Sequence, residues 1–443
     1  MCGIAGVLTS GAASHDAVQR DLERMISSIR HRGPDDAGFW VDGGAGIGLG
    51  QARLSIVDLS PMGHQPMLTD DGRLVITFNG EIYNHRDIRK ELPGTNWRGG
   101  SDTETFLAAI RAWGLHEALN RAVGMFAFAL WDRDRGVLSL ARDRMGEKPL
   151  YYGWNKGSFL FGSELKALRA HPAFQAGVNR DALAYYVRTG YVGGADCIYQ
   201  GIAKVPPGSY LEVSIEDRTP KETSYWSVAR AVDAARRRPF EGDAADAVRE
   251  LEQLLAASVR GQMLADVPLG AFLSGGVDSS TIVSLMQCAS TVPVKTFTIG
   301  FNEAGFDEAA HARLVASHLG TDHTELHLSA NDALGVVPSL PAIYDEPFAD
   351  SSQMPTILVS RLARRHVTVA LSGDGGDELF CGYSRYRHVE EKWGKLSRAP
   401  GAMRGLLGNV LPRSALTDGL AARSLDEFYR FSNTQWKGYG GIV

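Results

Sequence analysis

The sequence predicts two domains of different fold class. Residues 2–190 are expected to form an α+β domain, and residues 243–443 an α/β domain with a doubly wound parallel sheet, with a connector over residues 191–242. The length of 443 residues suits two or three domains of ordinary size. Strand and hairpin patterns dominate the first part, whereas short apolar strands alternate with helices after residue 243. We infer the connector from the change between these two patterns.

The first domain carries three clear element patterns. Residues 73–83 (RLVITFNGEIY) are typical of a strand, and residues 126–140 (FAFALWDRDRGVLSL) contain two apolar runs around a polar turn, which predicts a hairpin. Residues 103–113 place Phe106, Ile110 and Trp113 on one helical stripe. The segment after residue 190 carries paired glycines, a Pro-Pro-Gly turn and three consecutive arginines, so we expect a connector there.

The second domain is predicted from alternating elements. We expect helices over residues 244–263, 279–287 and 307–319, and strands over residues 270–273, 294–301 and 367–371. The first and last of these strands run into glycine-rich turns. Because ligands of open parallel sheets bind at the carboxyl ends of the strands, the two turns predict a binding site.

Composition and charge exclude several function classes. A net charge of −5 argues against nucleic acid or an anionic membrane as the main partner. No apolar run has the length of a membrane span, and the N-terminal residues lack the basic region of a secretory signal. The four cysteines are widely spaced, which suits neither a zinc site nor a disulfide scaffold, and a reducing, cytoplasmic setting is expected: Cys2, Cys197, Cys288 and Cys381.

Cys2 is the first candidate for catalysis. If Met1 is removed, the Cys2 thiol lies beside a free α-amine, which titrates near neutrality and can accept the thiol proton. The result is an activated nucleophile that needs no histidine. A cysteine at position two is, taken alone, also compatible with chance.

Five motifs, found in this order along the chain, favour a catalytic role for Cys2 over chance. They are MCGIAGV at the N-terminus, HRGPD at 31–35, RLSI at 53–56, NGEIYN at 79–84 and SDTE at 101–104. Together they resemble the class II glutamine amidotransferase domain, an N-terminal-nucleophile fold. The resemblance implies that Cys2 attacks the side-chain amide of glutamine. It also implies that the Asn79 side chain and the Gly80 backbone N–H stabilise the oxyanion.

The same resemblance assigns the binding of free glutamine. Arg53 would bind the α-carboxylate through its guanidinium group, and Asp102 with Glu81 would bind the α-ammonium. Each residue also has a simpler interpretation taken alone: a surface ion pair for Arg53, a turn residue for Asn79, and a helix N-cap for Ser101 or Asp102.

The glycine-rich turn at residues 274–280 (SGGVDSS) is the second candidate site. Its backbone N–H groups and the following helix N-terminus suit an anion, and the chain has no Walker motif. The turn resembles the loop of ATP pyrophosphatases, which implies ATP as a substrate. Asp278 is a suitable ligand for Mg²⁺, because hard cations prefer carboxylate oxygens.

The second turn, at residues 372–380 (SGDGGDELF), matches the SG[DE]GxDE motif of the asparagine-synthetase-like family, and DEPFADSS at 345–352 also matches. A calcium-binding acidic loop is disfavoured, because the spacing differs from that of an EF-hand. The resemblance implies acceptor binding by Asp374 and Asp377, and Mg²⁺ binding by Asp278 and Asp377. The ATP-binding residues that it implies are Leu273, Ser274, Gly275, Gly276, Asp278, Ser279, Ile299, Ser372 and Gly373.

Two features depart from the family pattern. Cys381 stands where the family more often has glycine, and we expect a small buried thiol without a role. Family members also carry a lysine in a segment that ends in an R-x-PFLD-like motif. The three lysines after residue 384 are Lys392, Lys395 and Lys437, and none lies in such a segment. We therefore expect the C-terminal synthetase region to be incomplete.

The resemblance implies a glutamine-hydrolysing asparagine synthetase that makes asparagine, glutamate, AMP and pyrophosphate from aspartate, glutamine, ATP and water. Two alternatives stay open. One is an amidotransferase that acts on another carboxylate in natural-product or cell-envelope biosynthesis. The other is a glutaminase or metabolite-binding protein without ligase activity. The expected partners are small molecules, with neither nucleic acid nor membrane among them, and a homodimer is left open.

Overall fold

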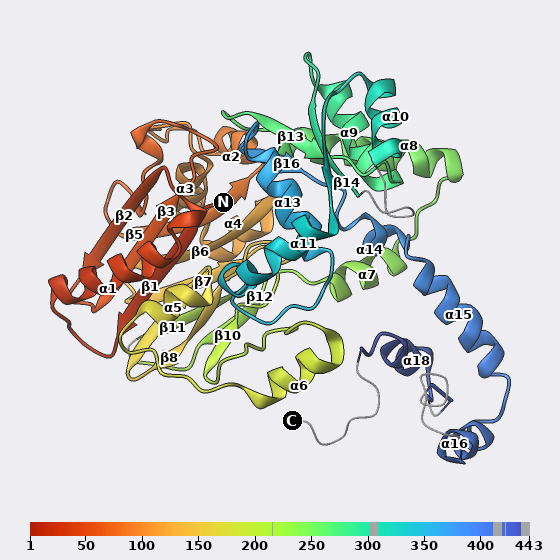
Figure 1. Cartoon of the computed structure of the whole chain (residues 1–443). Helices are drawn as coiled ribbons and strands as arrows, with labels where there is room; N and C mark the ends of the chain where they lie inside the picture. Colours follow the sequence, from red (N-terminus) through yellow and green to blue (C-terminus); the bar gives the residue numbers. More distant parts are fainter. Residues whose placement is uncertain (215, 302–308, 411–418, 421, 436–443) are drawn as a thin grey trace. The chain divides into compact units, whose positions relative to one another are not determined.

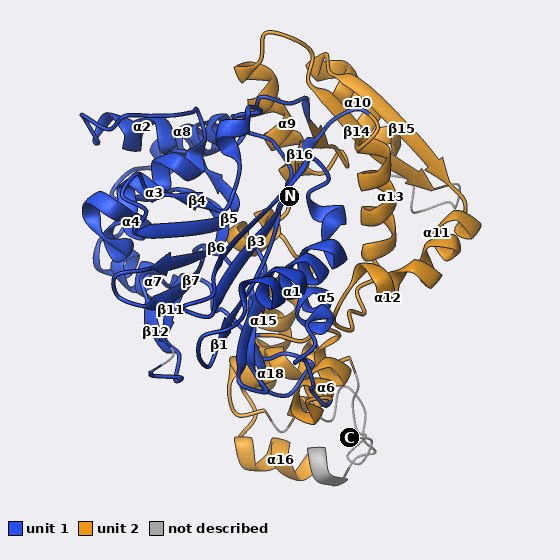
Figure 2. Cartoon of the chain, turned by 90° about the vertical axis from the view of Figure 1, so that its left-hand side faces the viewer, with its two compact units in different colours: residues 1–177, 194–269, 366–369 blue, residues 178–193, 270–365, 370–443 orange. Residues whose placement is uncertain are grey.

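The computed structural model describes all residues except 215, 302–308, 411–418, 421 and 436–443 (Figure 1). The chain forms two compact units, coloured separately in Figure 2. Unit 1 contains residues 1–177, 194–269 and 366–369, and unit 2 contains residues 178–193, 270–365 and 370–443.

Unit 1 is built on two six-stranded antiparallel sheets. The first has the order β10-β8-β9-β1-β3-β2, made of β1 (Gly3–Thr9), β2 (Asp36–Asp42), β3 (Ile47–Arg53), β8 (Tyr151–Asn155), β9 (Ser158–Gly162) and β10 (Ile202–Lys204). The second has the order β12-β11-β7-β6-β5-β4, made of β4 (Met67–Leu68), β5 (Leu74–Ile82), β6 (Gly124–Asp132), β7 (Val137–Arg142), β11 (Ser209–Ser214) and β12 (Lys221–Ser224). The predicted strand at 73–83 and the predicted hairpin at 126–140 are confirmed.

The two sheets form the middle of a four-layer sandwich. Apolar side chains of both sheets meet in one core, which includes Leu49 of β3 and Trp131 of β6. Helices α1 (His15–Ser28) and α5 (Leu165–Ala170) pack on the first sheet. Helices α2 (His85–Lys90), α3 (Asp102–Trp113) and α4 (Leu115–Arg121) cover the second sheet through a core that includes Phe78 and Phe106. The α+β sandwich is therefore confirmed, and with it the helix predicted at 103–113.

The predicted connector at 191–242 differs from the structure. Its strand β10 pairs with β8 in the first sheet, and its strand β11 pairs with β7 and β12 in the second. Leu211 and Val213 of β11 alternate with polar residues and point into the core between the sheets. These strands are short and are separated by glycine and proline turns, so the turn signals obscured the alternation.

Unit 2 contains the four-stranded sheet β15-β14-β13-β16, with β13 (Leu269–Phe272), β14 (Lys295–Phe301), β15 (Asp322–Leu328) and β16 (Val369–Leu371). β13, β14 and β15 are parallel, and the helices α10 (Ala309–Leu319) and α13 (Gln353–Ala363) pack against β14. This confirms the predicted parallel sheet. The start of the helix predicted at 307–319 lies outside the described residues. β15 was not predicted, because its charged and histidine residues conceal a strand pattern.

The remaining α-helices of the described chain are α6 (Arg180–Thr189), α7 (Val228–Arg237), α8 (Ala244–Gln262), α9 (Val277–Ala289), α11 (Ala330–Val336), α12 (Leu340–Ile343), α14 (Gly376–Phe380), α15 (Ser384–Leu396), α16 (Gly401–Val410) and α18 (Leu425–Ser432). Helices α8 and α9 agree with the predicted helices at 244–263 and 279–287. Among the described helices, none combines the length and apolar character that crossing a membrane requires.

Candidate active site

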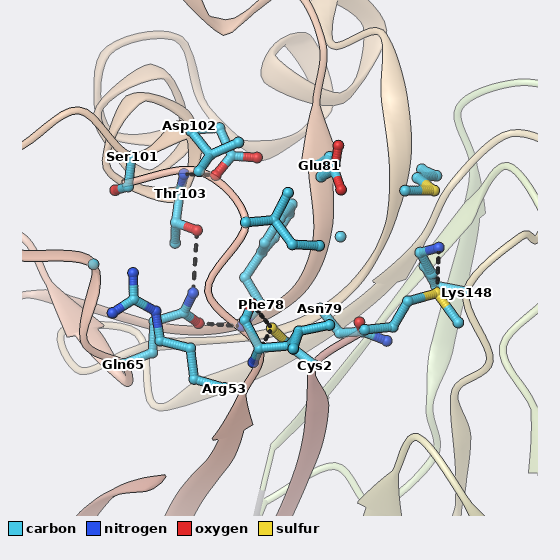
Figure 3. Close-up of a pocket in the computed structure, with 17 residues that line it drawn as sticks. Cys2, Arg53, Gln65, Phe78, Asn79, Glu81, Ser101, Asp102, Thr103 and Lys148 are labelled. Carbon is cyan, nitrogen blue, oxygen red and sulfur yellow. Dashed lines mark hydrogen bonds between the residues drawn. The ribbon is translucent and has the colours of Figure 1, made fainter. Parts of the chain in front are cut away.

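A pocket in unit 1 surrounds Cys2 (Figure 3). The six residues that the sequence predicts for the glutaminase all line it: Cys2, Arg53, Asn79, Gly80, Glu81 and Asp102. The other lining residues are Met1, Leu54, Ile56, Val57, Gly63, Gln65, Phe78, Ser101, Thr103, Met125 and Lys148. The two residues before β1, the strands β3, β5 and β6, and the start of α3 therefore bring together segments that are far apart in the sequence.

The alternation of side chains along β5 places two of these residues. Asn79 and Glu81 share a face with Thr77, whose Oγ1 donates to the Gly50 carbonyl of β3 at 3.2 Å. Gly80 lies between them against β6. A Cβ atom at this position would lie 2.2 Å from the carbonyl oxygen of Met125, so only glycine permits the observed register.

The Cys2 thiol is held at the end of β3. Its Sγ accepts a hydrogen bond from the Leu54 N–H at 3.4 Å and donates to the Leu54 carbonyl at 3.5 Å. Arg32 anchors the Cys2 main chain, because its Nε donates to the Cys2 carbonyl at 2.9 Å while its Nη1 contacts Glu164 at 2.7 Å. Burial raises the pKa of the Cys2 thiol, so this nucleophile needs a base to become a thiolate.

The chain terminus beside Cys2 is suited to supply that base. In this structure the terminal amine belongs to Met1, and burial lowers its pKa to about 6, with Arg32 and Lys148 adding further lowering. An amine with this pKa is largely unprotonated at pH 7. Removal of Met1 would leave the Cys2 α-amine as the chain terminus, next to the thiol.

Asn79 has unused hydrogen-bonding capacity. The residue is 0 % exposed, and neither its Oδ1 nor its Nδ2 has a hydrogen-bond partner within the described part of the chain. Leaving a buried polar group unpaired costs about 1–3 kcal/mol. Two unpaired atoms on one side chain that lines the pocket are therefore a reason to expect a polar ligand there.

Two buried carboxylates line the pocket near each other. Burial raises the pKa of Asp102 to about 6. Burial, together with the charge of Asp102, raises the pKa of Glu81 to about 7. Asp102 is held by backbone N–H groups of Ile82 and Thr103, each at 2.8 Å. Lys148 and the terminal amine offset part of the charge of Glu81. Two buried carboxyl groups in one pocket suit a cationic ligand group such as an α-ammonium.

Ser101 and Arg53 have different structural surroundings. Ser101 is the N-cap of α3, because its hydroxyl accepts from the Glu104 N–H at 3.2 Å, whereas Asp102 is the first helical residue. Arg53 is buried and donates to the carbonyls of Ser60 and Asp58 at 3.2 and 2.5 Å. The described residues form no ion pair with Arg53, so it is not a surface ion pair.

Sequence reasoning missed two polar residues of this pocket. Gln65 connects β5 with α3, because its Oε1 accepts from Phe78 N–H at 2.7 Å and its Nε2 donates to Thr103 Oγ1 at 3.1 Å. Lys148 is 4 % exposed, and its Nζ lies 2.7 Å from Met1 Sδ. Both residues come from loops outside the five motifs, and no local periodicity marks them.

A second candidate site lies in unit 2, where the loop 274–276 connects β13 to α9. The hydroxyl groups of Ser274 and Ser279 are 2.9 Å apart, and Gly275 has a φ of +79°, a conformation that favours glycine. Gly276 is the N-cap of α9, and no side chain caps the first turn. The N–H groups of that turn are therefore suited to a phosphate.

The two glycine-rich turns are adjacent, since β13 and β16 are neighbours in the sheet. A Cβ atom on Gly373 would lie 2.7 Å from the Ser279 backbone nitrogen, and one on Gly376 would lie 2.4 Å from Asp278 Oδ2. The backbones approach each other where only glycine fits. Most of the residues predicted for ATP binding are therefore together, from Leu273 to Ser279 on one turn and Ser372 and Gly373 on the other, while Ile299 lies on β14, next to β13.

The acidic residues predicted for Mg²⁺ and the acceptor lie on or beside these turns. Asp278 is in the first turn of α9, and Asp377 is in the first turn of α14. Asp374 accepts from the Ser372 hydroxyl at 3.1 Å. Within the described residues no three His, Cys, Asp or Glu side chains converge as a metal site. Because Mg²⁺ usually takes one or two carboxylates together with water and substrate phosphates, this donor set still fits it.

Two protein families match this chain, one over each half. The glutamine amidotransferase domain family matches residues 1–226, and the asparagine synthase family matches residues 250–439. Asparagine synthetase [glutamine-hydrolyzing] 1 of Bacillus subtilis is 35% identical over 96% of this chain and 65% of its own length. A Methanocaldococcus jannaschii protein, provisionally named asparagine synthetase [glutamine-hydrolyzing] 2, is 34% identical over 98% of this chain and 85% of its own length.

The chain belongs to the family of glutamine-hydrolysing asparagine synthetases. This is a family of ligases that combine a glutamine amidotransferase domain with an ATP-using asparagine synthase domain. Amidase chry2 of Gibberella zeae is also similar, at 33% identity over 87% of this chain and 60% of that protein. Among solved structures, the glutamine phosphoribosylpyrophosphate amidotransferase of B. subtilis has a TM-score of 0.39 and 15% identity, over 73% of this chain and 65% of its own.

Against the asparagine synthetase pattern, the expectation for Cys381 is wrong in one respect. The residue is exposed rather than buried. Its φ of 57° is in the left-handed region, which explains why glycine is favoured after α14. Of the lysines considered in place of the family lysine, Lys392 and Lys395 are exposed on α15, and Lys437 lies outside the described residues.

Proposed function

We propose that this chain is a glutamine-hydrolysing asparagine synthetase, which transfers the amide nitrogen of glutamine to aspartate at the expense of ATP. The observation that carries the proposal is the pocket of unit 1. It combines a thiol next to the chain terminus, an unpaired buried carboxamide, a buried guanidinium and two buried carboxylates. This set matches each functional group of free glutamine.

The first half-reaction begins with removal of Met1. The Cys2 α-amine accepts the thiol proton, and Sγ attacks the glutamine side-chain carbonyl carbon. The Asn79 Nδ2 and the Gly80 N–H stabilise the oxyanion, and collapse releases ammonia as the amine returns its proton to the leaving nitrogen. Water then hydrolyses the thioester, which gives glutamate and restores the thiol.

Substrate binding uses the charged residues of the same pocket. Arg53 binds the α-carboxylate of glutamine, and Asp102 with Glu81 binds its α-ammonium. Because the pKa of Glu81 is about 7 in the empty pocket, an arriving ammonium favours its ionised form. Glutamine binding near pH 7 is therefore expected to release a proton.

The second half-reaction uses the glycine-rich turns of unit 2. The first turn of α9 and the serine hydroxyls of Ser274 and Ser279 hold the ATP phosphates, and Gly373 allows the second turn to approach the nucleotide. Aspartate attacks the α-phosphorus of ATP to form an acyl-adenylate with release of pyrophosphate, and ammonia displaces AMP to form the amide. Bound Mg²⁺, held by Asp278 and Asp377, would neutralise charge on the phosphates.

The test is to incubate the chain with glutamine, ATP, Mg²⁺ and aspartate and to measure all products. The proposal predicts glutamate and asparagine, with AMP and pyrophosphate from ATP. Release of ADP and orthophosphate would contradict the assignment of the second site. Substituting ammonia for glutamine separates the two half-reactions, because ammonia enters only the second.

A second candidate differs in the acceptor. The similarity to amidase chry2 is nearly as high as the similarity to the asparagine synthetases, so identity of this size does not select aspartate. The candidate function is amide formation on another carboxylate in natural-product or cell-envelope biosynthesis. An acceptor screen that measures AMP release distinguishes them: aspartate as the best acceptor supports the first, and a different carboxylate supports the second.

A further inference from the structure

Lys148 is a buried cation that the proposed reaction does not use. The residue is 4 % exposed, lines the Cys2 pocket, and contacts Met1 through Nζ and Sδ at 2.7 Å (Figure 3). An unpaired ammonium is rarely buried to this extent, because removing it from water costs free energy. Its burial beside the chain terminus therefore requires a reason.

The loop that carries Lys148 is built around one buried carboxylate. Asp143 is 0 % exposed and accepts hydrogen bonds from the backbone N–H groups of Phe126, Met145, Glu147 and Lys148, at 3.1, 3.1, 2.9 and 3.0 Å. The Lys148 carbonyl in turn accepts from Arg142 Nε at 2.6 Å. The main chain of Lys148 is thus fixed on both sides, and the side chain is directed into the pocket by a rigid support.

The charges that face the chain terminus come from three elements. Arg32 follows α1 and contacts the Cys2 carbonyl, Glu81 is on β5, and Lys148 is on the loop after β7. Arg32 is already paired with Glu164. Within the described residues, the Lys148 ammonium makes its side-chain hydrogen bond to Met1 Sδ and forms no ion pair. Removal of Met1 removes that contact and leaves the ammonium facing the new terminus.

Resting on the glutaminase proposed above, we infer that Lys148 is a positioning residue whose buried positive charge keeps the Cys2 α-amine in its unprotonated, proton-accepting form. Two like charges in one buried pocket repel each other, and the terminal amine is the weaker base of the two. Glu81 acts in the opposite direction. Both cations lower the pKa of the terminal amine and Glu81 raises it, in agreement with this assignment.

The test compares Lys148→Met, which removes the charge, with Lys148→Arg, which keeps it. We expect the acidic limb of the pH profile of kcat/KM for glutamine to move up by about one pH unit in Lys148→Met and to stay in place in Lys148→Arg. Lys90→Met is the matched control, because Lys90 is exposed on α2, where it pairs with Asp87 at 2.7 Å. This variant removes the same charge at a solvent-exposed position outside the pocket, so its pH profile should not move.

A second measurement does not depend on turnover. In protein labelled with [¹³C]cysteine and shown by mass spectrometry to begin at Cys2, the Cα chemical shift of Cys2 reports the charge of its amine. The midpoint of this titration should rise in Lys148→Met relative to the unchanged chain. An unchanged midpoint, or a uniform loss of kcat/KM at every pH, would overturn the inference and leave Lys148 a purely structural role. Absence of glutamate formation by the unchanged chain would instead contradict the proposed function, while the titration still decides on Lys148.

Discussion

The Sγ atom of Cys2 lies 3.4 Å from the backbone nitrogen of Leu54, so the nucleophile just before β1 is held beside the residue that follows β3. This contact crosses 52 residues of sequence and lies just beyond the antiparallel pairing of β1 with β3, which begins at Gly3 and Ala52. The thiol is thus presented to the pocket by the sheet itself rather than by a flexible terminus.

Cys2→Ala should abolish the use of glutamine and preserve ammonia-dependent synthesis. Removal of a nucleophile commonly costs on the order of 10⁴-fold or more in kcat. Glutamate release and amide formation from ammonia are measured side by side. Full glutamine hydrolysis by a protein that mass spectrometry shows to retain Met1 would contradict the role of the terminal amine, because Met1 converts that amine into a peptide nitrogen.

Asn79→Ala should lower the kcat for glutamine hydrolysis by about 10²–10³-fold, as expected for the loss of one oxyanion donor. The variant should not lose stability to the same degree, because both amide atoms of Asn79 lack partners in the described chain. Steady-state kinetics and thermal unfolding are compared on the same samples. A large fall in Tm with unchanged kcat would show that Asn79 is structural.

Glu81→Gln should make the substrate-free protein more stable at high pH. The pKa of Glu81 is raised from 4.5 to about 7 in the folded state, so the folded protein binds this proton more tightly than the unfolded chain. Stability from this group is fully present below pH 4.5 and is lost as the pH rises through about 7. The full difference corresponds to about 3 kcal/mol as an upper limit.

The measurement for Glu81→Gln is the difference in unfolding free energy from the unchanged chain at pH 5 and pH 8. The gain should be small at pH 5 and larger at pH 8, while affinity for glutamine falls at both. Glu23→Gln, at an exposed position of α1, controls for the change in net charge. A gain that is equal at the two pH values would show that Glu81 is not protonated in the folded state.

Gly373→Ala should disrupt ATP use and leave the glutaminase intact. The added Cβ atom would lie 2.7 Å from the Ser279 backbone nitrogen, so the two glycine-rich turns must separate. We expect AMP formation to fall by at least tenfold, because the phosphate-binding groups lose their alignment. Gly335→Ala on α11 is the control, since its Cβ atom would meet no atom within 4 Å. Equal AMP formation by both variants would argue against a nucleotide site here.

Asp278→Asn removes one carboxylate beside the proposed phosphate site. We expect AMP and pyrophosphate formation to fall by about 10²-fold or more, since charge on the phosphates would be less well neutralised. The Mg²⁺ concentration needed for the half-maximal rate should rise in this variant, and it is measured in the same series. Near-normal synthesis by this variant would remove Asp278 from the metal site.

The sequence by itself determined the fold classes, most elements and the motif residues. Period-two alternation in β5 and β6 and helical spacing in α3 are local properties, so residues 73–83, 126–140 and 103–113 were predictable. Cys2, Arg53, Asn79 and Asp102 were predictable because each lies in a short motif whose residue types match one step of glutamine chemistry.

Only the tertiary structure decided which sheets the strands β10 and β11 join and which loop residues enter the pocket. β10 and β11 are short strands whose pairing partners lie in distant segments, so residues 191–242 resembled a connector. Lys148 entered the pocket because Asp143 organises its loop through four backbone N–H groups, a contact with no periodic signal. The pKa values of Glu81 and Asp102 rise because folding removes both carboxyl groups from water. Burial of this kind depends on packing between sheets and helices, which no local pattern of residues contains.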